Sequence, residues 1–220
     1  KTPLFHIQGY ISTLVDNHID NPEIHKRYLE RTEKSAERLI HILEDLDTIS
    51  QLEAKEVRSD LEPFDIVELC KDVLESEAID AEQKNILLVR QNEIEKAGVI
   101  GDRFRIRQVM VNLTVNSIKY GKKDGQTTIK IKNEPETIYV EVADNGIGIA
   151  KEHLPRLFER FYRVDKGRSR EQGGTGLGLS IVKHILEAHH QYIQVKSTEG
   201  EGTIFSFRLK KAPHHSSFSH

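Results

Sequence analysis

The chain has 220 residues and a formal net charge of −3, and 37% of its residues are hydrophobic and 30% charged. This length and composition predict a soluble protein of one large or two modest domains, and the slight acidity gives no electrostatic case for a nucleic-acid partner. No run approaches the roughly 20 apolar residues of a membrane-spanning helix, and the first residues do not read as a signal peptide.

The first quarter of the chain predicts two helices joined by a short turn. Apolar residues recur at helical spacing over residues 3–20, and the segment Asp-Asn-Pro-Glu at 20–23 is typical of a helix end followed by a new helix start. The second helix, over residues 22–52, carries a heptad pattern. Its seam positions are Tyr28, Thr32, Ser35, Leu39, Ile42, Leu46 and Ile49.

A helical hairpin with one apolar seam per helix cannot close a hydrophobic core by itself. The economical arrangement is a homodimer in which two hairpins pair into a four-helix bundle. The alternative is that the seam packs on the rest of its own chain. The pattern favours the dimer.

From residue 57 the pattern changes. We expect an extended piece at 57–64, helices at 65–80, 102–120 and 178–190, and a short helix with an aromatic-rich turn at 151–164. Strands are expected at 86–89, 99–100, 127–132, 138–143, 192–197 and 203–209. The single cysteine, Cys70, falls in an apolar helical pattern and is expected in the core.

Antiparallel strands with segregated helices predict an α+β fold, in which one layer of helices covers one sheet as an α/β sandwich. The expected domains are a helical hairpin over 1–55, the sandwich over 56–211 and a disordered tail over 212–220.

Glycines stand at positions 173, 174, 176 and 178, directly before an apolar helical pattern. Glycine permits a close backbone approach, and a helix N-terminus offers unpaired N–H groups and a partial positive charge, so this segment favours phosphate binding. It is not a Walker A loop, because no Gly-Lys-Ser/Thr follows, and no strand precedes it as in a dinucleotide fingerprint. A tight connection without a ligand is the alternative.

Asn112, Asn116 and Lys119 share one face of the predicted helix 102–120. Asparagine is a poor helix former, so two of them among apolar positions indicate a function rather than two solvent-facing side chains. An amide oxygen can ligate Mg²⁺ without adding negative charge beside a triphosphate, and Lys119 can pair with a phosphate oxygen.

Asp144 directly follows a predicted strand, in the segment Asp-Asn-Gly-Ile-Gly. A carboxylate at a strand end can accept a hydrogen bond from an exocyclic amine such as adenine N6, and Gly146 and Gly148 would let the backbone pass close to a flat base. Taken alone, Asp-Asn-Gly is typical of a simple turn.

Four segments in this order and spacing resemble the catalytic ATP-binding domain of sensor histidine kinases, which belongs to the superfamily of gyrase-type and Hsp90-like ATPases. They are residues 112–120, 144–148, 158–163 (Phe-Glu-Arg-Phe-Tyr-Arg) and 174–178. The hairpin is similar to the dimerisation and histidine-phosphotransfer domain of the same kinases. The resemblance covers nearly the whole chain, residues 1–210.

The resemblance implies ATP and Mg²⁺ as cofactors and assigns a role to each matched residue. Asn116 would be the main Mg²⁺ ligand with Asn112 beside it, and Lys119 would contact phosphate. Tyr120 would lie against the adenine or ribose, and Asp144 would recognise adenine by accepting a hydrogen bond from its N6 amine.

The remaining roles concern the rim of the same site. Gly146 and Gly148 would shape the base pocket. The phosphate end would be closed by Gly174, Thr175, Gly176, Leu177 and Gly178, with residues 147–173 as a mobile lid. Phe158 and Phe161 would pack on the domain as lid residues, and Arg163 is a candidate for the γ-phosphate, with an exposed salt-bridging arginine as the alternative.

One part of the family pattern falls outside the printed residues. The phospho-accepting histidine of the family stands three residues before a Lys/Arg-Thr-Pro sequence, and this chain starts at Lys1-Thr2-Pro3. We therefore expect a fragment that binds nucleotide without accepting a phosphoryl group, and we interpret the histidines at 6, 18, 25 and 41 as structural. Thr2 matches the position that helps orient water for dephosphorylating the partner in related kinases.

The predicted function is the cytoplasmic kinase core of a two-component sensor. The γ-phosphoryl of ATP–Mg²⁺ would pass to a histidine and then to an aspartate in the receiver domain of a response regulator, with a phosphatase activity as a further expectation. The whole protein is expected to be membrane-anchored through an N-terminal part. Two alternatives are a non-catalytic dimeric scaffold and an ATP-hydrolysing clamp of the gyrase or Hsp90-like type, although Asn112 stands where a clamp would need a glutamate base.

Overall fold

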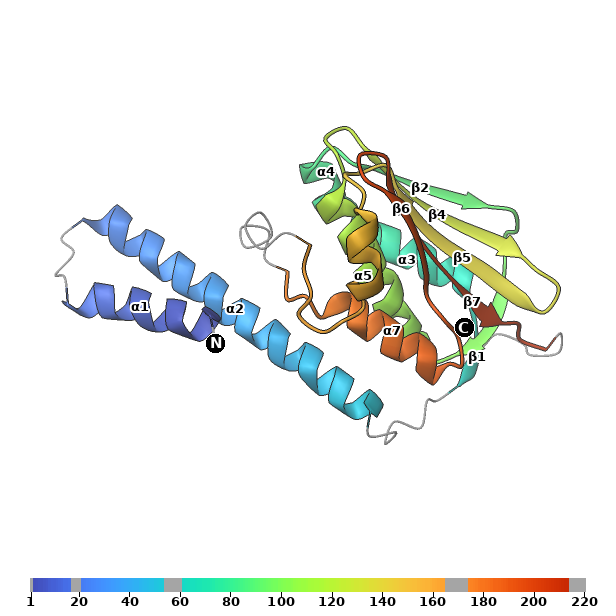
Figure 1. The fold of residues 1–220 in the computed structure, drawn as a ribbon, viewed down its shortest axis with the longest axis horizontal. Coiled ribbons are helices and arrows are strands. Elements are labelled where there is room, and N and C mark those ends of the chain that lie inside the picture. The colour runs from blue at the N-terminus through green and yellow to red at the C-terminus, as the bar shows by residue number, and fades with distance from the viewer. Residues whose placement is uncertain (1, 17–20, 54–60, 165–173, 214–220) are drawn as a thin grey trace.

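The computed structural model describes residues 2–16, 21–53, 61–164 and 174–213. A helical hairpin projects to one side, and an α/β sandwich forms the other (Figure 1). Within the described ranges, no helix combines the length and the apolar character that crossing a bilayer requires.

The hairpin consists of α1 (Thr2–Asp16) and α2 (Pro22–Glu53). The Asn21 side chain caps α2, because its Oδ1 accepts the N–H groups of Glu23 at 2.9 Å and Ile24 at 3.3 Å. The expected helix 3–20 ends at Asp16 in the described part, and residues 17–20 lie outside it. The two helices contact one another through the rings of Tyr10 and Tyr28, whose centroids are 5.8 Å apart.

The second half of α2 packs on the sandwich rather than on α1, because α1 has 15 residues and α2 has 32. Ile49 is only 1% exposed and belongs to the main core, and Ile42 and Leu46 pack against that core. The alternative interpretation of the heptad therefore holds for this half of the helix. A different set of large apolar side chains on the hairpin is exposed: Leu4, Phe5, Ile11, Val15, Ile24, Leu29, Ile40 and Leu43.

The main sheet has five strands in the order β2-β4-β5-β7-β6. They are β2 (Leu87–Asn92), β4 (Gln126–Asn133), β5 (Thr137–Asp144), β6 (Gln194–Thr198) and β7 (Gly202–Lys210). The expectation of antiparallel strands is wrong for β2 and β4, which pair in parallel. The physical reason is the connection between them, which passes through a strand and a long helix, as a parallel crossover requires.

The expected single sheet is also incomplete, since β1 (Glu62–Asp65) and β3 (Gly98–Gly101) form a separate antiparallel pair. The helices α3 (Ile66–Ser76), α5 (Arg103–Tyr120) and α7 (Gly178–Ala188) cover one face of the main sheet (Figure 1). The expected helix 65–80 breaks at Glu77, and α4 (Ala78–Gln83) follows it. The expected short helix after residue 150 is a 3-10 helix, η1 (Lys151–Arg156).

The core of the sandwich lies between this helical layer and the sheet. Cys70 is fully buried there, as expected, and burial raises the pKa of its thiol, so the thiolate is disfavoured. The expected tail begins as an ordered segment, because the Ala212 N–H donates to the Gly98 carbonyl at 3.0 Å. Residues 214–220 of that tail lie outside the described residues.

Candidate functional site

The antiparallel contact of α5 with α7 brings two of the predicted segments together. A Cβ atom added at Gly178, the first residue of α7, would lie 3.3 Å from the Asn112 Oδ1. Two turns further along α5, the Lys119 Nζ lies directly against Gly174. The two glycines thus mark where the glycine segment runs beside the polar face of α5.

Asn112, Asn116 and Lys119 are all partly buried on α5. The buried face of the same helix carries Ile106, Val109, Met110 and Leu113, which fix its orientation in the core. The amide-bearing face is therefore turned toward the glycine segment and the solvent edge of the sandwich.

Lys119 lies in an electropositive environment. Burial, the largest cause, and the neighbouring cations Arg163, Lys84 and Arg38 together lower the pKa of its ammonium from 10.5 to about 8. The Nζ also lies 5.3 Å from the centroid of the Tyr120 ring. A negatively charged group placed here would restore the charged form of Lys119.

Asp144, the last residue of β5, has one carboxylate oxygen fixed by the backbone. Its Oδ1 accepts the Gly146 N–H at 2.8 Å and the Thr203 N–H at 3.3 Å. Burial raises the pKa of this carboxyl, and the two N–H donors act in the opposite direction. The oxygen Oδ1 thus holds the side chain in place, and the second oxygen, Oδ2, takes no part in these two hydrogen bonds.

The turn after Asp144 is anchored to the end of α5. The Ile147 N–H donates to the Tyr120 carbonyl at 3.1 Å, and Gly146 passes so close to that carbonyl that a Cβ would collide with it. Gly148 has φ +65° and faces the Thr198 carbonyl in the same manner. Asp144, Tyr120 and both glycines therefore belong to one corner of the molecule.

The glycine segment is held in place from three sides. The Thr175 Oγ1 accepts the Leu177 N–H at 3.1 Å and donates to the Asp45 Oδ2 at 2.9 Å. The side chain of Leu177 is fully buried, and Gly176, at φ +78°, accepts the Phe161 N–H at 2.9 Å.

The hairpin takes part in this arrangement through Arg38 as well as Asp45. The Arg38 Nη2 donates to the Gly174 carbonyl at 3.1 Å. Sequence reasoning missed both α2 residues, because they stand 136 and 130 positions from their partners and carry no local pattern that distinguishes them from solvated helix charges.

The two lid phenylalanines differ in their packing. Phe158 packs edge-on against the core residue Phe205, with ring centroids 6.5 Å apart, as expected. Phe161 is 55% exposed and has φ +62°, so its expected packing on the domain is wrong in this structure. The reason is local: the turn that directs its N–H to Gly176 points the ring outward. The lid residues 165–173 lie outside the described residues.

Two further predicted residues lie at the edges of the arrangement. Arg163 is partly buried, and its Cγ would be 3.4 Å from a Cβ added at Gly176. Thr2 is the first residue of α1, and its side chain is not described.

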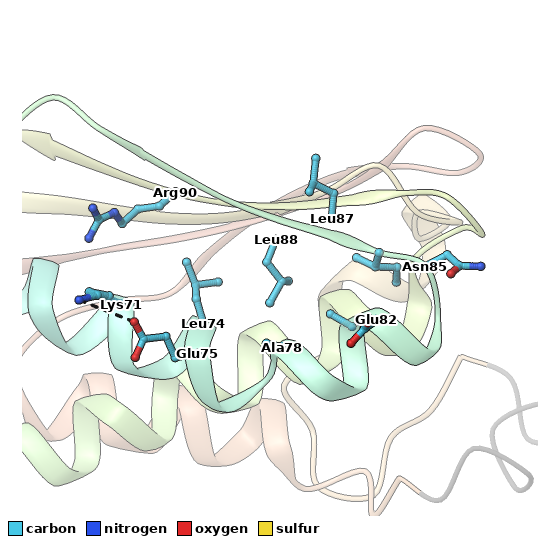
Figure 2. Close-up of a pocket in the computed structure, with 11 residues that line it drawn as sticks. Lys71, Leu74, Glu75, Ala78, Glu82, Asn85, Leu87, Leu88 and Arg90 are labelled. Carbon is cyan, nitrogen blue, oxygen red and sulfur yellow. Dashed lines mark ion pairs between the residues drawn. The ribbon is translucent and has the colours of Figure 1, made fainter.

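A groove of about 600 Å³ lies elsewhere, between the helices α3–α4 and the edge strand β2 (Figure 2). Leu74 and Leu88 point toward one another across it, and Lys71 and Glu75 form an ion pair of 3.7 Å at its rim. It contains none of the predicted site residues. Its lining is largely aliphatic and brings together neither the amide face of α5, nor the Asp144 turn, nor the glycine segment, so we do not consider it as the nucleotide site.

The candidate site suits a ligand with a flat amine-bearing part and an anionic part. Within the described residues, no group of three or more His, Cys, Asp and Glu side chains could hold a metal ion. Any cation at this site would instead have to combine amide oxygens, such as those of Asn112 and Asn116, with oxygens of the ligand, a donor set that suits Mg²⁺.

Comparison with known sequence families gives two matches. Residues 101–213 match the family described as histidine kinase-, DNA gyrase B-, and HSP90-like ATPase, and residues 1–55 match the His Kinase A (phospho-acceptor) domain. The sensor histidine kinase WalK of Bacillus subtilis is 35% identical over 211 residues, which are 95% of this chain and 34% of WalK. The chain thus spans about a third of the length of that relative.

Solved structures share the arrangement of both parts. The histidine kinase AdeS of Acinetobacter baumannii aligns with a TM-score of 0.77 at 27% identity, covering 96% of each chain. The histidine kinase ThkA, in a complex with the response regulator protein TrrA, aligns with a TM-score of 0.76 at 26% identity, covering 97% of this chain and 59% of that one.

Proposed function

Because the chain belongs to the sensor histidine kinases of two-component systems, with an HSP90-like ATPase domain after a His Kinase A hairpin, we propose that it is the ATP-dependent kinase core of such a sensor. It would bind ATP–Mg²⁺ and transfer the γ-phosphoryl group to a histidine. We propose the domain limits 1–55 and 56–211, with the tail from 212.

One observation carries the proposal. Three segments that are separated in sequence converge at the ends of α5 and α7: the amide face of α5, the Asp144 turn, and the glycine segment. The contacts Asn112–Gly178, Lys119–Gly174 and Tyr120–Ile147 tie them together. This convergence supports a nucleotide site in which the phosphate chain would lie along the glycine segment and the purine beside the Asp144 turn.

The roles of the residues follow from their chemistry. The second carboxylate oxygen of Asp144, Oδ2, would accept a hydrogen bond from adenine N6, because Oδ1 is occupied by backbone N–H groups. Tyr120 would lie against the base or ribose, beside Gly146 and Gly148. Lys119 and Arg163 would neutralise phosphate oxygens at the end of the site closed by residues 174–178.

Asn116 and Asn112 would hold Mg²⁺, and the donor set fits, because amide oxygens suit this ion and leave its positive charge available to the phosphates. When bound, the ion neutralises and orients the phosphate oxygens. Phosphoryl transfer needs little covalent chemistry from the protein, so positioning and charge neutralisation supply most of the rate. This explains why the recognisable residues are ligands rather than a nucleophile and a base.

We propose that the kinase is a homodimer, and the exposed apolar side chains of the hairpin support this. Leu29, Ile40 and Leu43 on α2 and Leu4 and Phe5 on α1 are each at least half exposed. Apolar surface of this extent on a helical hairpin is typical of an interface, and a second copy would complete a four-helix bundle.

The acceptor and the partner are proposed from the family. The acceptor would be a histidine three residues before Lys1, and the phosphoryl group would pass to a response regulator, as the complex of the relative ThkA with its regulator suggests. Outward positions early in α1, such as Gln8 and Ser12, would contact the regulator, and Thr2 would assist dephosphorylation. The whole protein would be membrane-anchored with this part in the cytoplasm.

Isothermal titration with Mg²⁺ and the non-hydrolysable analogue AMPPNP tests the proposal. We expect the printed chain to bind, and Asn116→Ala to lose at least about tenfold in affinity through the lost metal ligand. Asn133→Ala serves as the control, because Asn133 is exposed at the far end of β4. If the folded wild type does not bind the analogue, the proposal is wrong, and a non-catalytic scaffold becomes the better description.

A further inference from the structure

Three cations from three different elements lie around two glycines of the glycine segment. The Arg38 Nη2 on α2 donates to the Gly174 carbonyl at 3.1 Å, and the Lys119 Nζ on α5 lies against the same glycine. Arg163 packs beside Gly176, two residues further on. Lys119 and Arg163 belong to the sandwich, whereas Arg38 belongs to the hairpin.

The position of Arg38 is fixed by packing rather than by chance contact. One turn further along α2, Ile42 packs against the core of the sandwich, and Leu46 and Ile49 continue the same contact. Asp45, on the same face of the helix, binds Thr175 at 2.9 Å. The apolar contacts of α2 and the Asp45–Thr175 hydrogen bond thus fix the helix beside the glycine segment, where the partly buried Arg38 side chain donates to Gly174.

We propose that Arg38 is a nucleotide-binding residue, so that the hairpin helix of the same chain completes the phosphate end of the site and contacts the terminal phosphate of the triphosphate. This inference rests on the proposed nucleotide site. A guanidinium offers several donors in a plane and binds phosphate oxygens in pairs, which suits it to this position better than a lysine.

The electrostatics of the site agree with this role. Burial lowers the pKa of Lys119, and Arg163, Lys84 and Arg38 act in the same direction, so Arg38 is close enough for its charge to be felt at the phosphate end. A polyphosphate would convert this mutual repulsion into attraction. Asp45 has the opposite charge and flanks the same segment, so it should oppose anion binding modestly.

The placement also has a consequence for signalling. If Arg38 contacts the terminal phosphate, the bound nucleotide stabilises the packing of α2 on the sandwich. By reciprocity of binding free energies, a change in the position of α2 then alters nucleotide affinity by the same factor. Rearrangements of the hairpin would thus change the nucleotide affinity through the Arg38 side chain.

The test is calorimetric titration of the 220-residue chain with Mg²⁺–AMPPNP and with Mg²⁺–ADP. We expect Arg38→Ala to weaken AMPPNP binding about tenfold, as for a charge-assisted hydrogen bond, and to affect ADP much less. Arg38→Lys should restore part of the loss. Arg31→Ala is the matched control, because Arg31 is an exposed arginine two turns earlier on α2. The affinity of this variant for both nucleotides should equal that of wild type.

Asp45→Asn distinguishes charge from loop positioning. An amide oxygen can still accept the Thr175 hydroxyl, so the loop is kept while a negative charge is removed, and AMPPNP binding should become tighter by about twofold to threefold. Weaker binding in this variant would indicate that α2 only positions the loop, and it would overturn the proposal. Unchanged or tighter AMPPNP binding by Arg38→Ala would also overturn it. So would a loss of affinity in Arg38→Ala that is equal for AMPPNP and ADP. Circular dichroism of each variant verifies that it is folded.

Failure of the inference can be separated from failure of the proposed function. If wild type binds AMPPNP, Asn116→Ala weakens it and Arg38→Ala does not, the nucleotide site stands and only the role of Arg38 is wrong. If wild type binds neither nucleotide, both proposals are wrong.

Discussion

The backbone N–H of Asp102 donates to the Nε2 of His189 across 2.9 Å. Asp102 is the residue that caps α5, and His189 is the first residue after α7. The His189 Nδ1 lies 2.7 Å from the Ile185 carbonyl, so this nitrogen carries the hydrogen and the other accepts. The contact joins the ends of α5 and α7 that are remote from the candidate site, and so helps to fix the register of the two helices.

His189→Ala should lower the free energy of unfolding by about 1–3 kcal/mol, because it removes two hydrogen bonds and leaves the Asp102 N–H without its acceptor. Urea unfolding followed by circular dichroism measures the effect. His189→Gln can place an amide oxygen near the position of Nε2 and should recover part of the stability. His189→Asn reaches only the Ile185 carbonyl and should recover less, and equal stability of the two variants would contradict this account.

The affinity of wild type for AMPPNP should fall as the pH rises from 7 to 9. Lys119 has a pKa of about 8 in the folded chain without ligand, and a bound phosphate favours its charged form. As the pH rises past 8, binding therefore requires Lys119 to take up a proton, and this weakens the affinity. Titration calorimetry at a series of pH values measures the profile. Lys119→Arg keeps its charge and should flatten the profile, whereas a wild-type profile as flat as that of the variant would argue against a phosphate contact.

The same pKa shift predicts the sign of a stability effect. The pKa of Lys119 is lowered from 10.5, so between about pH 8 and 10.5 the folded chain binds fewer protons at this residue than the unfolded chain. Its contribution to the free energy of unfolding therefore rises with pH through that window. Lys119→Met should lack this increase.

Asp144→Asn should weaken AMPPNP binding by about tenfold or more while leaving the fold intact. The amide oxygen can keep the two backbone N–H groups that Oδ1 accepts, and this turns the NH₂ group toward the adenine amine, donor against donor. Titration calorimetry measures the loss. A guanine nucleotide, which presents a carbonyl at the corresponding position, should lose less, and equal losses for both bases would contradict the assigned contact.

The same substitution should change the pH dependence of stability. The folded-state pKa of Asp144 is raised above 3.8, so the folded chain binds more protons there than the unfolded chain between the two pKa values. This contribution to stability is lost as the pH rises through that window. The stability of Asp144→Asn relative to wild type should therefore increase with pH from about 3 and then level off.

The double variant Leu29→Glu, Leu43→Glu should weaken self-association at least about 100-fold, because two leucines per copy would no longer be buried and four carboxylates would face one another. Light scattering after size-exclusion chromatography measures the mass in solution. Lys34→Glu is the control on an exposed position of α2. A wild-type chain that is monomeric at all concentrations would contradict the dimer.

Local patterns were sufficient for most of the elements. The bounds of α2 and α5, the strands β4, β5 and β7, and the buried position of Cys70 agree with expectation, because helix and strand periodicity and capping are read from neighbours along the chain. The parallel pairing of β2 with β4 was missed, because pairing depends on contacts between residues far apart in sequence.

The sequence also did not show that the first half of α2 packs beside α1 and the second half on the sandwich. A periodic apolar pattern states that a face is buried, but not against what. The choice depended on the length of α1, which covers only the first half of α2, and on the shape of the sandwich that receives Ile42, Leu46 and Ile49.

The groups that carry the chemistry of this protein can be read from the chain alone, because its amides, its glycines, the carboxylate after a strand and their order are local features, and they are sufficient to identify the family. Their assembly depends on the folded arrangement, since the approach of Arg38 and Asp45 to the glycine segment spans 130 residues or more. Local patterns specify which groups a segment offers. Long-range packing specifies which groups meet.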